Sequence, residues 1–387
     1  MDVDRATSLL GGLSPRQFMR RHWQKTPLLV RGAIPGVAPP LARAALFALV
    51  ADDGVESRLI VRDGERWTLR HGPLPRRALP PLARPGWTLL VQGLDLHADA
   101  ARVLLDRFRF VADARLDDLM VSFASDGGGV GAHVDSYDVF LLQVQGQRRW
   151  RVSSQRDLAL RPGVPLRLLE NFRPEAEWLL DPGDLLYLPP RWAHEGVAVG
   201  GDCMTCSIGA RAPSRGDIAQ AVLQRALDVV EPGAPGARYR DAGTPATGAP
   251  GRIPGALARF AAGAVARFVA DGESLACALG ETLTEPKATV RFEPGADADT
   301  GADPAPARGV RLDRRSRMLY DDRRIYLNGE SYLVRGRDAA AMRRLADRRR
   351  LDAAEVRRLS ADARETLADW LAVGWAHRAD GATGAAR

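Results

Sequence analysis

The spacing of apolar and polar residues divides this chain into a strand-rich part and a helix-rich part. Between residues 118 and 211, short apolar or alternating runs such as LLYLPP and CMTCSIGA are separated by Gly, Pro and Asp. Alternation with a period of two is typical of strands, and many short strands with frequent turns are typical of a jelly roll. We predict an α+β protein whose first domain, residues 1–213, contains a double-stranded β-helix over about residues 88–211.

The residues before this core predict two helices and a hairpin that cap it. Ser14 is a favoured N-cap and Pro15 a favoured first residue for a helix over 14–23. A second helix is expected over 38–50. An Asp-Gly pair inside 57–71 is typical of the turn of a hairpin.

Several strands are expected within the roll. An alternating strand is predicted over 133–144, followed by a turn at 145–147 and a return strand. Two strands are predicted on either side of the Asp-Pro-Gly sequence at 181–183. Two more, beginning near Trp192 and Cys203, close the roll.

After Pro213 the apolar spacing becomes helical. Ser214 and Asp217 form a capping-box-like start, and apolar residues then recur three or four positions apart. A second such run covers 257–268, beyond a Pro- and Gly-rich loop. Two apolar-striped helices outside a completed barrel need a partner surface, so residues 214–280 are predicted to form a homodimer. Packing of these helices on their own barrel is the alternative.

The last part of the chain, residues 281–387, predicts a separate small domain. A linker-like stretch begins at Gly295, and an Asn-Gly pair at 328–329 predicts a hairpin turn. Helices are expected around 342–345 and over 356–371. This order of strands and helices is typical of a winged-helix-like domain, a fold that contacts DNA in some proteins and other proteins elsewhere.

Length and composition are those of a globular chain. The 387 residues, 45% of them hydrophobic, are enough for a sizeable core. No apolar run approaches the roughly 20 residues that span a bilayer, and the N-terminus lacks a basic segment followed by an apolar one. We expect a cytoplasmic protein without a membrane partner.

The net charge of +7 is weak evidence for a nucleic-acid partner. The basic residues are almost all arginine, and Lys25 and Lys287 are the lysines. Together with abundant Ala and Gly, this skew is typical of genomic base composition. We therefore expect that the function of this protein does not require direct binding to a nucleic acid.

The three cysteines, Cys203, Cys206 and Cys277, are too few for a disulfide framework. Cys203 and Cys206 form a CxxC sequence, which in other proteins binds zinc or carries thiol redox chemistry. In an alternating strand, however, residues three apart face opposite sides. We therefore interpret both as small core residues.

A candidate metal site comes from His133 and Asp135, which are two apart in the predicted strand and so share a face. His194 can return to the same point in a barrel. Two imidazoles and a carboxylate are the ligands of non-haem Fe(II) oxygenases, which leave coordination positions open. A lone His-x-Asp is more often structural, but here glycines precede it and PGDLLYLPP leads to His194.

These motifs resemble the Jumonji-C/cupin-type ribosomal oxygenases, specifically the bacterial ribosomal-protein arginine hydroxylases. The resemblance rests on GGGVGAHVDSYDVFLLQVQGQRRW from Gly127, PGDLLYLPPRWAH from Pro182, SPRQFMRRHWQKTPLLVRG from Ser14 and CMTCSIGARAP from Cys203. It covers about the first 213 residues well. It implies a JmjC jelly roll, a dimer, and a C-terminal domain that contacts protein.

The resemblance also implies residues that hold a cosubstrate. The family places a basic residue fifteen positions after the first ligand, and here that residue is Arg148, whose guanidinium can grip a carboxylate. Arg149 points the other way and is expected to be solvated. Ser207, and with a weaker claim Ser122, would supply polar contacts. Both serines have an equally plausible role as satisfied core hydroxyls.

Tyr137 and Asp126 are candidates for contacts with a cationic substrate side chain. Tyr137 shares the predicted strand face of the metal ligands, and Asp126 precedes the glycines. Ring stacking and charge pairing would frame a guanidinium. A core tyrosine and a turn aspartate are the structural alternatives.

The resemblance predicts an Fe(II)-dependent dioxygenase that uses 2-oxoglutarate and O2 and hydroxylates an arginine of a large-subunit ribosomal protein. The alternatives are a JmjC oxygenase or demethylase with another protein substrate, and a cupin-like binding module without turnover. We find no Ser-His-Asp order, phosphate-binding loop or pair of catalytic carboxylates that competes with this prediction.

Overall fold

The computed structural model describes residues 2–228, 238–240, 252–294 and 308–379. The chain forms two compact units: Met1–Ala212 with Ala288–Arg291, and Pro213–Lys287 with Phe292–Arg387. Most of the predicted Pro- and Gly-rich loop and nearly all of the linker from Gly295 lie outside the described residues. The division into three domains stays a prediction beside this two-unit division.

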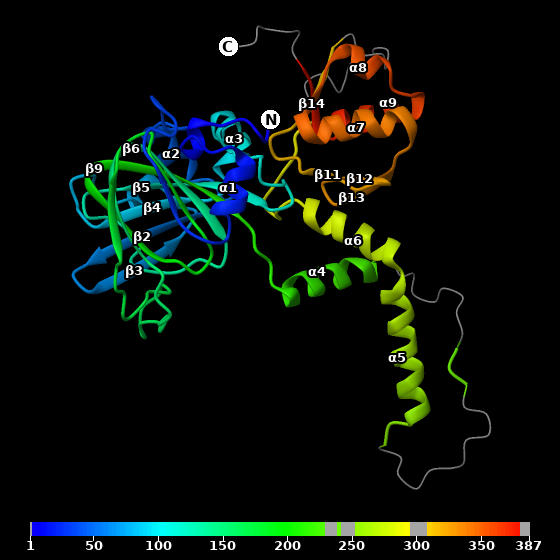
Figure 1. Ribbon diagram of the computed structural model, residues 1–387, viewed down its shortest axis with the longest axis horizontal. Helices are drawn as coiled ribbons and strands as arrows, with labels where there is room; N and C mark the ends of the chain where they lie inside the picture. Colours follow the sequence, from blue (N-terminus) through cyan, green and yellow to red (C-terminus); the bar gives the residue numbers. More distant parts are fainter. Residues whose placement is uncertain (1, 229–237, 241–251, 295–307, 380–387) are drawn as a thin grey trace. The chain divides into compact units, whose positions relative to one another are not determined.

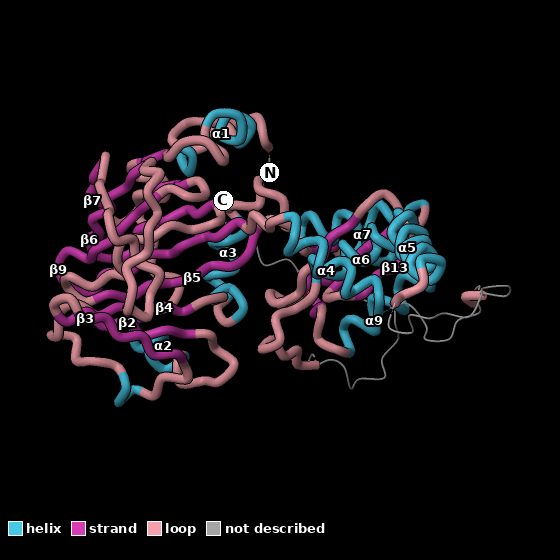
Figure 2. Tube along the Cα trace, turned by 90° about the horizontal axis from the view of Figure 1, so that it is seen from below, coloured by secondary structure: helices cyan, strands magenta, loops and turns pink. Residues whose placement is uncertain are grey.

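The first unit is built on one antiparallel nine-stranded sheet (Figures 1 and 2). The strand order is β1-β8-β6-β9-β5-β4-β2-β3, and β7 pairs with β6. This arrangement confirms the predicted jelly roll. The strands are β1 Leu28–Val30, β2 Ser57–Asp63, β3 Arg66–His71, β4 Trp87–Val91, β5 Leu116–Ala124, β6 Asp138–Ser153, β7 Ala176–Leu180, β8 Leu185–Leu188 and β9 Ala193–Ala210.

The predicted turn at 145–147 is wrong, because β6 continues through it. The register against β9 shifts on both sides of Gln145, and Gly146 takes a φ of 63°. A Cβ on Gly146 would lie 3.1 Å from the Asp202 carbonyl oxygen, so the tight contact and the positive φ both favour glycine in the bulge. Glycine in an alternating run predicts a turn or a bulge equally well, and pairing with β9 decides for the bulge. The two closing strands are likewise one strand, β9.

The strand predicted over 133–144 is also wrong in its first part, because β6 begins at Asp138. His133 forms only an isolated bridge with His194, and Asp135 lies in the connecting segment. Burial alternates within β6: Phe140 belongs to the main core cluster, whereas Val139 and Leu141 belong to a second cluster on the other face. The sheet therefore has a face for the core and a face for a site.

Helices cover the core face of this sheet. They are α1 Pro15–Arg21, α2 Arg43–Leu49 and α3 Asp99–Asp106, with 3-10 turns η1 Ser8–Leu10, η2 Arg76–Ala78 and η3 Leu94–Leu96. The predicted N-cap is confirmed, since Ser14 and Gln17 form a complete capping box. Phe18 of α1 packs on Tyr187 with ring centroids 4.9 Å apart. The predicted hairpin is β2–β3.

The second unit contains six helices and six short strands among its described residues. The helices are α4 Arg215–Asp228, α5 Gly255–Ala270, α6 Gly272–Thr284, α7 Gly336–Arg348, α8 Ala353–Arg357 and α9 Ala361–Ala372. The strands form two sheets, β14-β10-β15 and β11-β12-β13. Their bounds are β10 Val310–Leu312, β11 Met318–Tyr320, β12 Arg324–Leu327, β13 Glu330–Leu333, β14 Arg350–Leu351 and β15 Ala376–Arg378.

The local predictions for this unit are largely confirmed. Ser214 and Asp217 exchange backbone-to-side-chain hydrogen bonds at the start of α4. Asn328 and Gly329 turn the β12–β13 hairpin with positive φ angles of 51° and 89°. The helix expected over 356–371 is two helices, because the chain restarts at Ser360, which caps α9.

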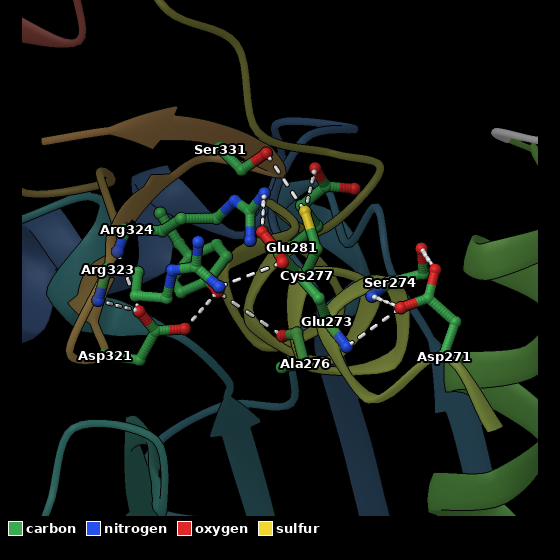
Figure 3. A network of polar contacts seen from close by, with 11 residues as sticks. Asp271, Glu273, Ser274, Ala276, Cys277, Glu281, Asp321, Arg323, Arg324 and Ser331 are labelled. Carbon is green, nitrogen blue, oxygen red and sulfur yellow. Dashed lines mark hydrogen bonds and ion pairs between the residues drawn. The ribbon is translucent and has the colours of Figure 1, made fainter. Parts of the chain in front are cut away.

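Helix α6 was not predicted, and it contains the predicted boundary between residues 280 and 281. Polar contacts join it to the β12–β13 hairpin (Figure 3). Glu273 accepts hydrogen bonds from Arg323 at 2.9 Å and Arg324 at 3.0 Å, and the Cys277 thiol donates to Ser331. A Cβ on Gly280 would lie 2.4 Å from the ring of Tyr326. Helix α6 is therefore tightly packed on this hairpin.

Candidate functional site

The structure brings His133, Asp135 and His194 together. Their potential ligand atoms all lie within 4.8 Å of one another. His133 Nε2 is 3.9 Å from Asp135 Oδ1, and His194 Nε2 is 3.6 Å from Asp135 Oδ2. Two imidazoles and one carboxylate at these separations can hold one divalent metal ion on one side and leave its other positions open.

Hydrogen bonds to the backbone orient both imidazoles. His133 Nδ1 lies 2.9 Å from the Gly131 carbonyl oxygen, and His194 Nδ1 lies 2.9 Å from that of Trp192. A carbonyl oxygen only accepts, so each ring carries its proton on Nδ1 when neutral. The lone pair is then on Nε2, the atom that faces Asp135. A backbone acceptor behind a histidine is a common support for a metal ligand.

Glycines allow the segment before His133 to lie against β9. A Cβ on Gly129 would lie 2.4 Å from the Gly196 carbonyl oxygen, so no larger residue fits. His133 then exchanges two backbone hydrogen bonds with His194, of 3.0 and 2.9 Å. The amide of Arg191 also donates to the Asp135 carbonyl oxygen at 2.8 Å. The ligands are thus fixed by backbone pairing even though they do not share a strand.

Burial keeps His194 neutral at ordinary pH. Its side chain is almost fully buried, and this desolvation, followed by the nearby His133, lowers the pKa of His194 to about 4. Asp135 opposes the shift to a smaller extent. A neutral imidazole is the form that binds a metal.

The three side chains line a pocket of about 340 Å³ together with Arg148, Ser122 and Ser207. Arg148 is only 3% exposed, and no described residue accepts a hydrogen bond from its Nε or Nη2 atom. A buried guanidinium with unused donors is costly unless an anion completes it. The pocket therefore suits a carboxylate next to a metal. Arg149, as predicted, points away and pairs with Glu177 at 3.3 Å.

The two serines differ in their contacts. Ser122 has a long hydrogen bond of 3.5 Å to the Thr205 carbonyl oxygen. Ser207 is 8% exposed and borders the pocket from β9. Both hydroxyls are close enough to line the space that Arg148 faces. Their cosubstrate roles stay predictions.

Of the two candidate substrate residues, the structure brings only Tyr137 to the pocket. Tyr137 lines it, and partial desolvation, followed by the charges of Asp135 and Asp118, raises the pKa of its phenol. Asp126 lies outside the pocket lining and accepts a hydrogen bond of 2.8 Å from the Gly200 amide. Its position is that of the turn aspartate that was the structural alternative.

Sequence reasoning assigned no role to several residues that line the pocket. Arg58 of β2 lines it and bonds to Gln92, while Trp150 of β6 lies two residues beyond Arg148. The segment 165–168 forms another part of the wall. The sequence could have predicted Trp150 as a pocket residue, because it shares a strand face with Arg148. It could not have predicted Arg58, since the position of Arg58 depends on the pairing of β2 with β4.

The two cysteines of the CxxC sequence lie in the core of the first unit. Cys203 and Cys206 are buried free thiols in different core clusters, so they face opposite sides as predicted. Burial raises the pKa of the Cys206 thiol.

Among the described residues, none of the helices has the length and apolar character needed to cross a bilayer.

Two family models match the chain. Residues 103–218 match the JmjC domain, and residues 268–377 match a ROXA-like winged helix. The first match spans most of the sheet and all three candidate ligands. The second begins just before α6, which agrees with the packing of that helix on the β12–β13 hairpin.

Curated relatives match about half of the chain. The ribosomal protein uL16 3-hydroxylase of Escherichia coli is 37% identical over 215 residues, which are 54% of this chain and 57% of that protein. A probable ribosomal oxygenase of Haemophilus influenzae is 34% identical over 52% of this chain and 50% of its own length. The alignment thus spans about half the length of each relative.

Solved structures match nearly the whole chain. The X-ray structure of E. coli YcfD superposes with a TM-score of 0.80 and 27% identity, and the match covers 94% of this chain and 98% of YcfD. A structure of the ribosomal oxygenase YcfD with cobalt and 2-oxoglutarate gives a TM-score of 0.79 with 26% identity, over 95% and 98% of the two chains. Both units therefore have counterparts in that fold.

Proposed function

We propose that the chain is a JmjC-domain ribosomal oxygenase, an Fe(II)- and 2-oxoglutarate-dependent dioxygenase that hydroxylates a protein side chain. The observation that carries the proposal is the combination of a His-Asp-His cluster with a buried, incompletely bonded arginine in one pocket. A metal site alone would suit many proteins. A metal site beside a carboxylate-binding cation suits a 2-oxoacid.

His133, Asp135 and His194 would hold the iron, with both imidazoles binding through Nε2. Arg148 would bind the far carboxylate of 2-oxoglutarate, with Ser207 and Ser122 as neighbouring hydroxyls. When bound, the iron and 2-oxoglutarate supply the oxidising chemistry that turns a C–H bond into C–OH. The chain would position the reactants, in a pocket whose walls are largely apolar.

The substrate we propose is an arginine of a large-subunit ribosomal protein. The support is the function of the E. coli relative, a ribosomal protein uL16 3-hydroxylase, together with Tyr137, whose ring could stack on a guanidinium. A more distant relative, 25% identical, is a bifunctional lysine-specific demethylase and histidyl-hydroxylase of Drosophila persimilis. Demethylation and histidine hydroxylation are therefore the rival activities.

Mass spectrometry of ribosomal proteins incubated with the enzyme, Fe(II), ascorbate and 2-oxoglutarate tests the proposal. The expected product is an arginine that has gained one oxygen atom, with succinate formed in equal amount. Loss of a methyl group from lysine, or oxygen on histidine, would identify a rival activity. If no substrate stimulates succinate formation although metal and 2-oxoglutarate bind, the protein is a cupin-like binding module.

We also propose that the protein works as a homodimer in the cytoplasm, where it would meet the ribosome. Helix α5 supports dimerisation, because Leu257, Val265 and Val269 are 38%, 63% and 39% exposed. Such an apolar row on one helix is costly in water. Helix α4 also exposes apolar side chains, since Leu223 and Leu227 are 38% and 58% exposed, and it contacts α6 through the hydrogen bond of 2.9 Å from Arg225 to Glu281.

Analytical ultracentrifugation of Val265→Glu tests this dimer. We expect the variant to sediment as a monomer at concentrations where the unmodified protein is a dimer. Leu333→Glu is the matched control, because Leu333 is 61% exposed but lies on β13. Equal dissociation of both variants, or a monomeric unmodified protein, would refute the proposed interface.

A further inference from the structure

We propose that Trp150 is a second donor to the cosubstrate: its indole N–H binds the 2-oxoglutarate carboxylate beside Arg148. This inference rests on the proposed function, because it assigns a new residue to the pocket of that function. Trp150 and Arg148 lie two apart on β6 and both line the pocket. Side chains two apart on a strand share a face.

Four nitrogen donors of residues that line the pocket are buried without an acceptor. They are Nε and Nη2 of Arg148, Nε1 of Trp150 and Nε of Arg58, and none of these atoms has a hydrogen-bond partner among the described residues. Trp150 is 5% exposed and Arg148 is 3% exposed. Buried donors are nearly always bonded in folded proteins, so neighbouring exceptions indicate an acceptor that arrives with a ligand. A carboxylate has about four acceptor positions, more than one guanidinium uses.

The packing of the indole determines which of its edges is available. Trp150 pairs with Gly196 of β9, and a Cβ on Gly196 would lie 2.7 to 2.9 Å from Cη2, Cζ3 and Cε3 of the ring. These three atoms form the edge opposite Nε1. Since that edge is against β9, the N–H edge is turned away from the Gly196 backbone. Glycine at 196 thus allows the ring to lie in this orientation.

The ring also lies close to both proposed binding groups. Its centroid is 5.8 Å from the guanidinium carbon of Arg148 and 5.9 Å from the ring of His194. Contact with the aromatic face holds the cation in place without using any of its N–H groups. Trp150 would thereby orient Arg148 and add one hydrogen bond of its own. A 2-oxoacid with a second carboxylate is the ligand that can reach both this corner and the metal.

Packing alone is the competing explanation, because Trp150 also belongs to the cluster of Val139, Leu141 and Leu186. Trp150→Phe separates the two explanations, since phenylalanine keeps an aromatic ring there but has no N–H group. Trp178→Phe is the matched control. Trp178 is the register partner of Trp150 on β7 and packs on the same cluster, but it does not line the pocket.

The first measurement is the indole N–H NMR spectrum of the full-length protein loaded with diamagnetic Zn(II), before and after addition of 2-oxoglutarate. The chain has eight tryptophans, and the resonance missing from Trp150→Phe identifies the one of interest. We expect 2-oxoglutarate to move that resonance downfield and slow its exchange with water. The Trp178 resonance should stay in place. An unmoved Trp150 resonance at saturating 2-oxoglutarate would overturn the proposal.

The second measurement is calorimetric titration of 2-oxoglutarate into the Zn(II)-loaded variants. We expect Trp150→Phe to weaken binding about tenfold, the loss of roughly one hydrogen bond to a charged group, while Zn(II) affinity stays unchanged. Trp178→Phe should bind like the unmodified protein. Equal affinities for Trp150→Phe and the unmodified protein would contradict the assignment. If the unmodified protein itself fails to bind 2-oxoglutarate, the proposed function fails first, and this inference with it.

Discussion

Two polar clusters in this protein, one in each compact unit, have opposite hydrogen-bonding states. In the network between α6 and the β12–β13 hairpin, the charged groups have partners: Glu273 accepts from Arg323 and Arg324 (Figure 3). In the pocket lined by His133, Asp135 and His194, Arg148 has buried N–H groups whose hydrogen bonds no described residue accepts. The paired network holds elements together, whereas the unpaired donors indicate where a ligand belongs.

The same difference appears in what each cluster costs the folded chain. The ion pairs of Glu273 are partly exposed, with 45% of its side chain accessible, so they contribute little to stability. Nε and Nη2 of the buried Arg148 have no partner among the described residues, and we expect a buried charge with unused donors to destabilise the ligand-free protein. Loss of the Arg148 charge should therefore stabilise the ligand-free protein, whereas loss of the Glu273 charge should slightly destabilise it.

The largest effect is expected from Asp135→Ala, which removes the carboxylate that faces both imidazoles. Turnover should fall below detection, because the remaining pair of histidines cannot hold iron firmly. The fold should persist, since backbone bonds between His133 and His194 remain. Succinate formation and circular dichroism check the two parts. Activity like that of the unmodified protein would exclude Asp135 as a ligand.

Arg148→Met should separate binding from stability. The apparent KM for 2-oxoglutarate should rise roughly 10- to 150-fold, the equivalent of losing about 1.5–3 kcal/mol of charge-assisted hydrogen bonding. The thermal midpoint of the ligand-free protein should rise, because an unpaired buried charge is replaced by an apolar side chain. Kinetics and calorimetry measure the two effects. A lower midpoint together with an unchanged KM would mean that Arg148 has a structural role.

The pH dependence of stability should reveal His194. Its pKa in the folded protein, about 4, is below the ordinary value, so the unfolded chain binds more protons at intermediate pH. The stability of the metal-free protein is therefore complete above pH 6.5 and falls as the pH drops toward 4. Between pH 7 and pH 5 the expected loss is about 2 kcal/mol.

Urea unfolding at these two pH values measures that loss. The control is His194→Gln, in which this contribution should disappear while those of the other five histidines remain. If the variant and the unmodified protein lose equal stability between pH 7 and pH 5, the imidazole of His194 is not held neutral by burial.

The smallest effect is expected in the paired network. Glu273→Gln should lower the free energy of unfolding by about 0–1 kcal/mol and leave turnover and 2-oxoglutarate affinity unchanged. The reason is that solvent screens both of its ion pairs, and α6 is also held by Gly280 against Tyr326. Urea unfolding and kinetics check this result. A changed KM for 2-oxoglutarate in this variant would show that the two clusters are coupled.

Two errors of the sequence predictions share one cause. The turn predicted at 145–147 is a bulge, and the strand predicted from His133 begins only at Asp138. Glycines in both places permit several backbone conformations, and the choice among them comes from pairing with β9. Helix α6 was missed although its start carries a local signal, the N-cap Asp271, which accepts hydrogen bonds from the amides of Glu273 and Ser274. The first two errors, by contrast, lie where pairing with a distant strand decides the local structure.

The sequence by itself determined the features that depend on residues within a few positions. The capping box at Ser14, the hairpin turn at Asn328 and the shared face of Arg148 and Trp150 are of this kind. Tertiary structure alone decided that His194 meets His133 and Asp135, that Arg58 borders the pocket, and that Asp126 does not. The physical reason is that side-chain periodicity acts over one turn or one strand, whereas convergence depends on the register between strands that lie far apart in the sequence.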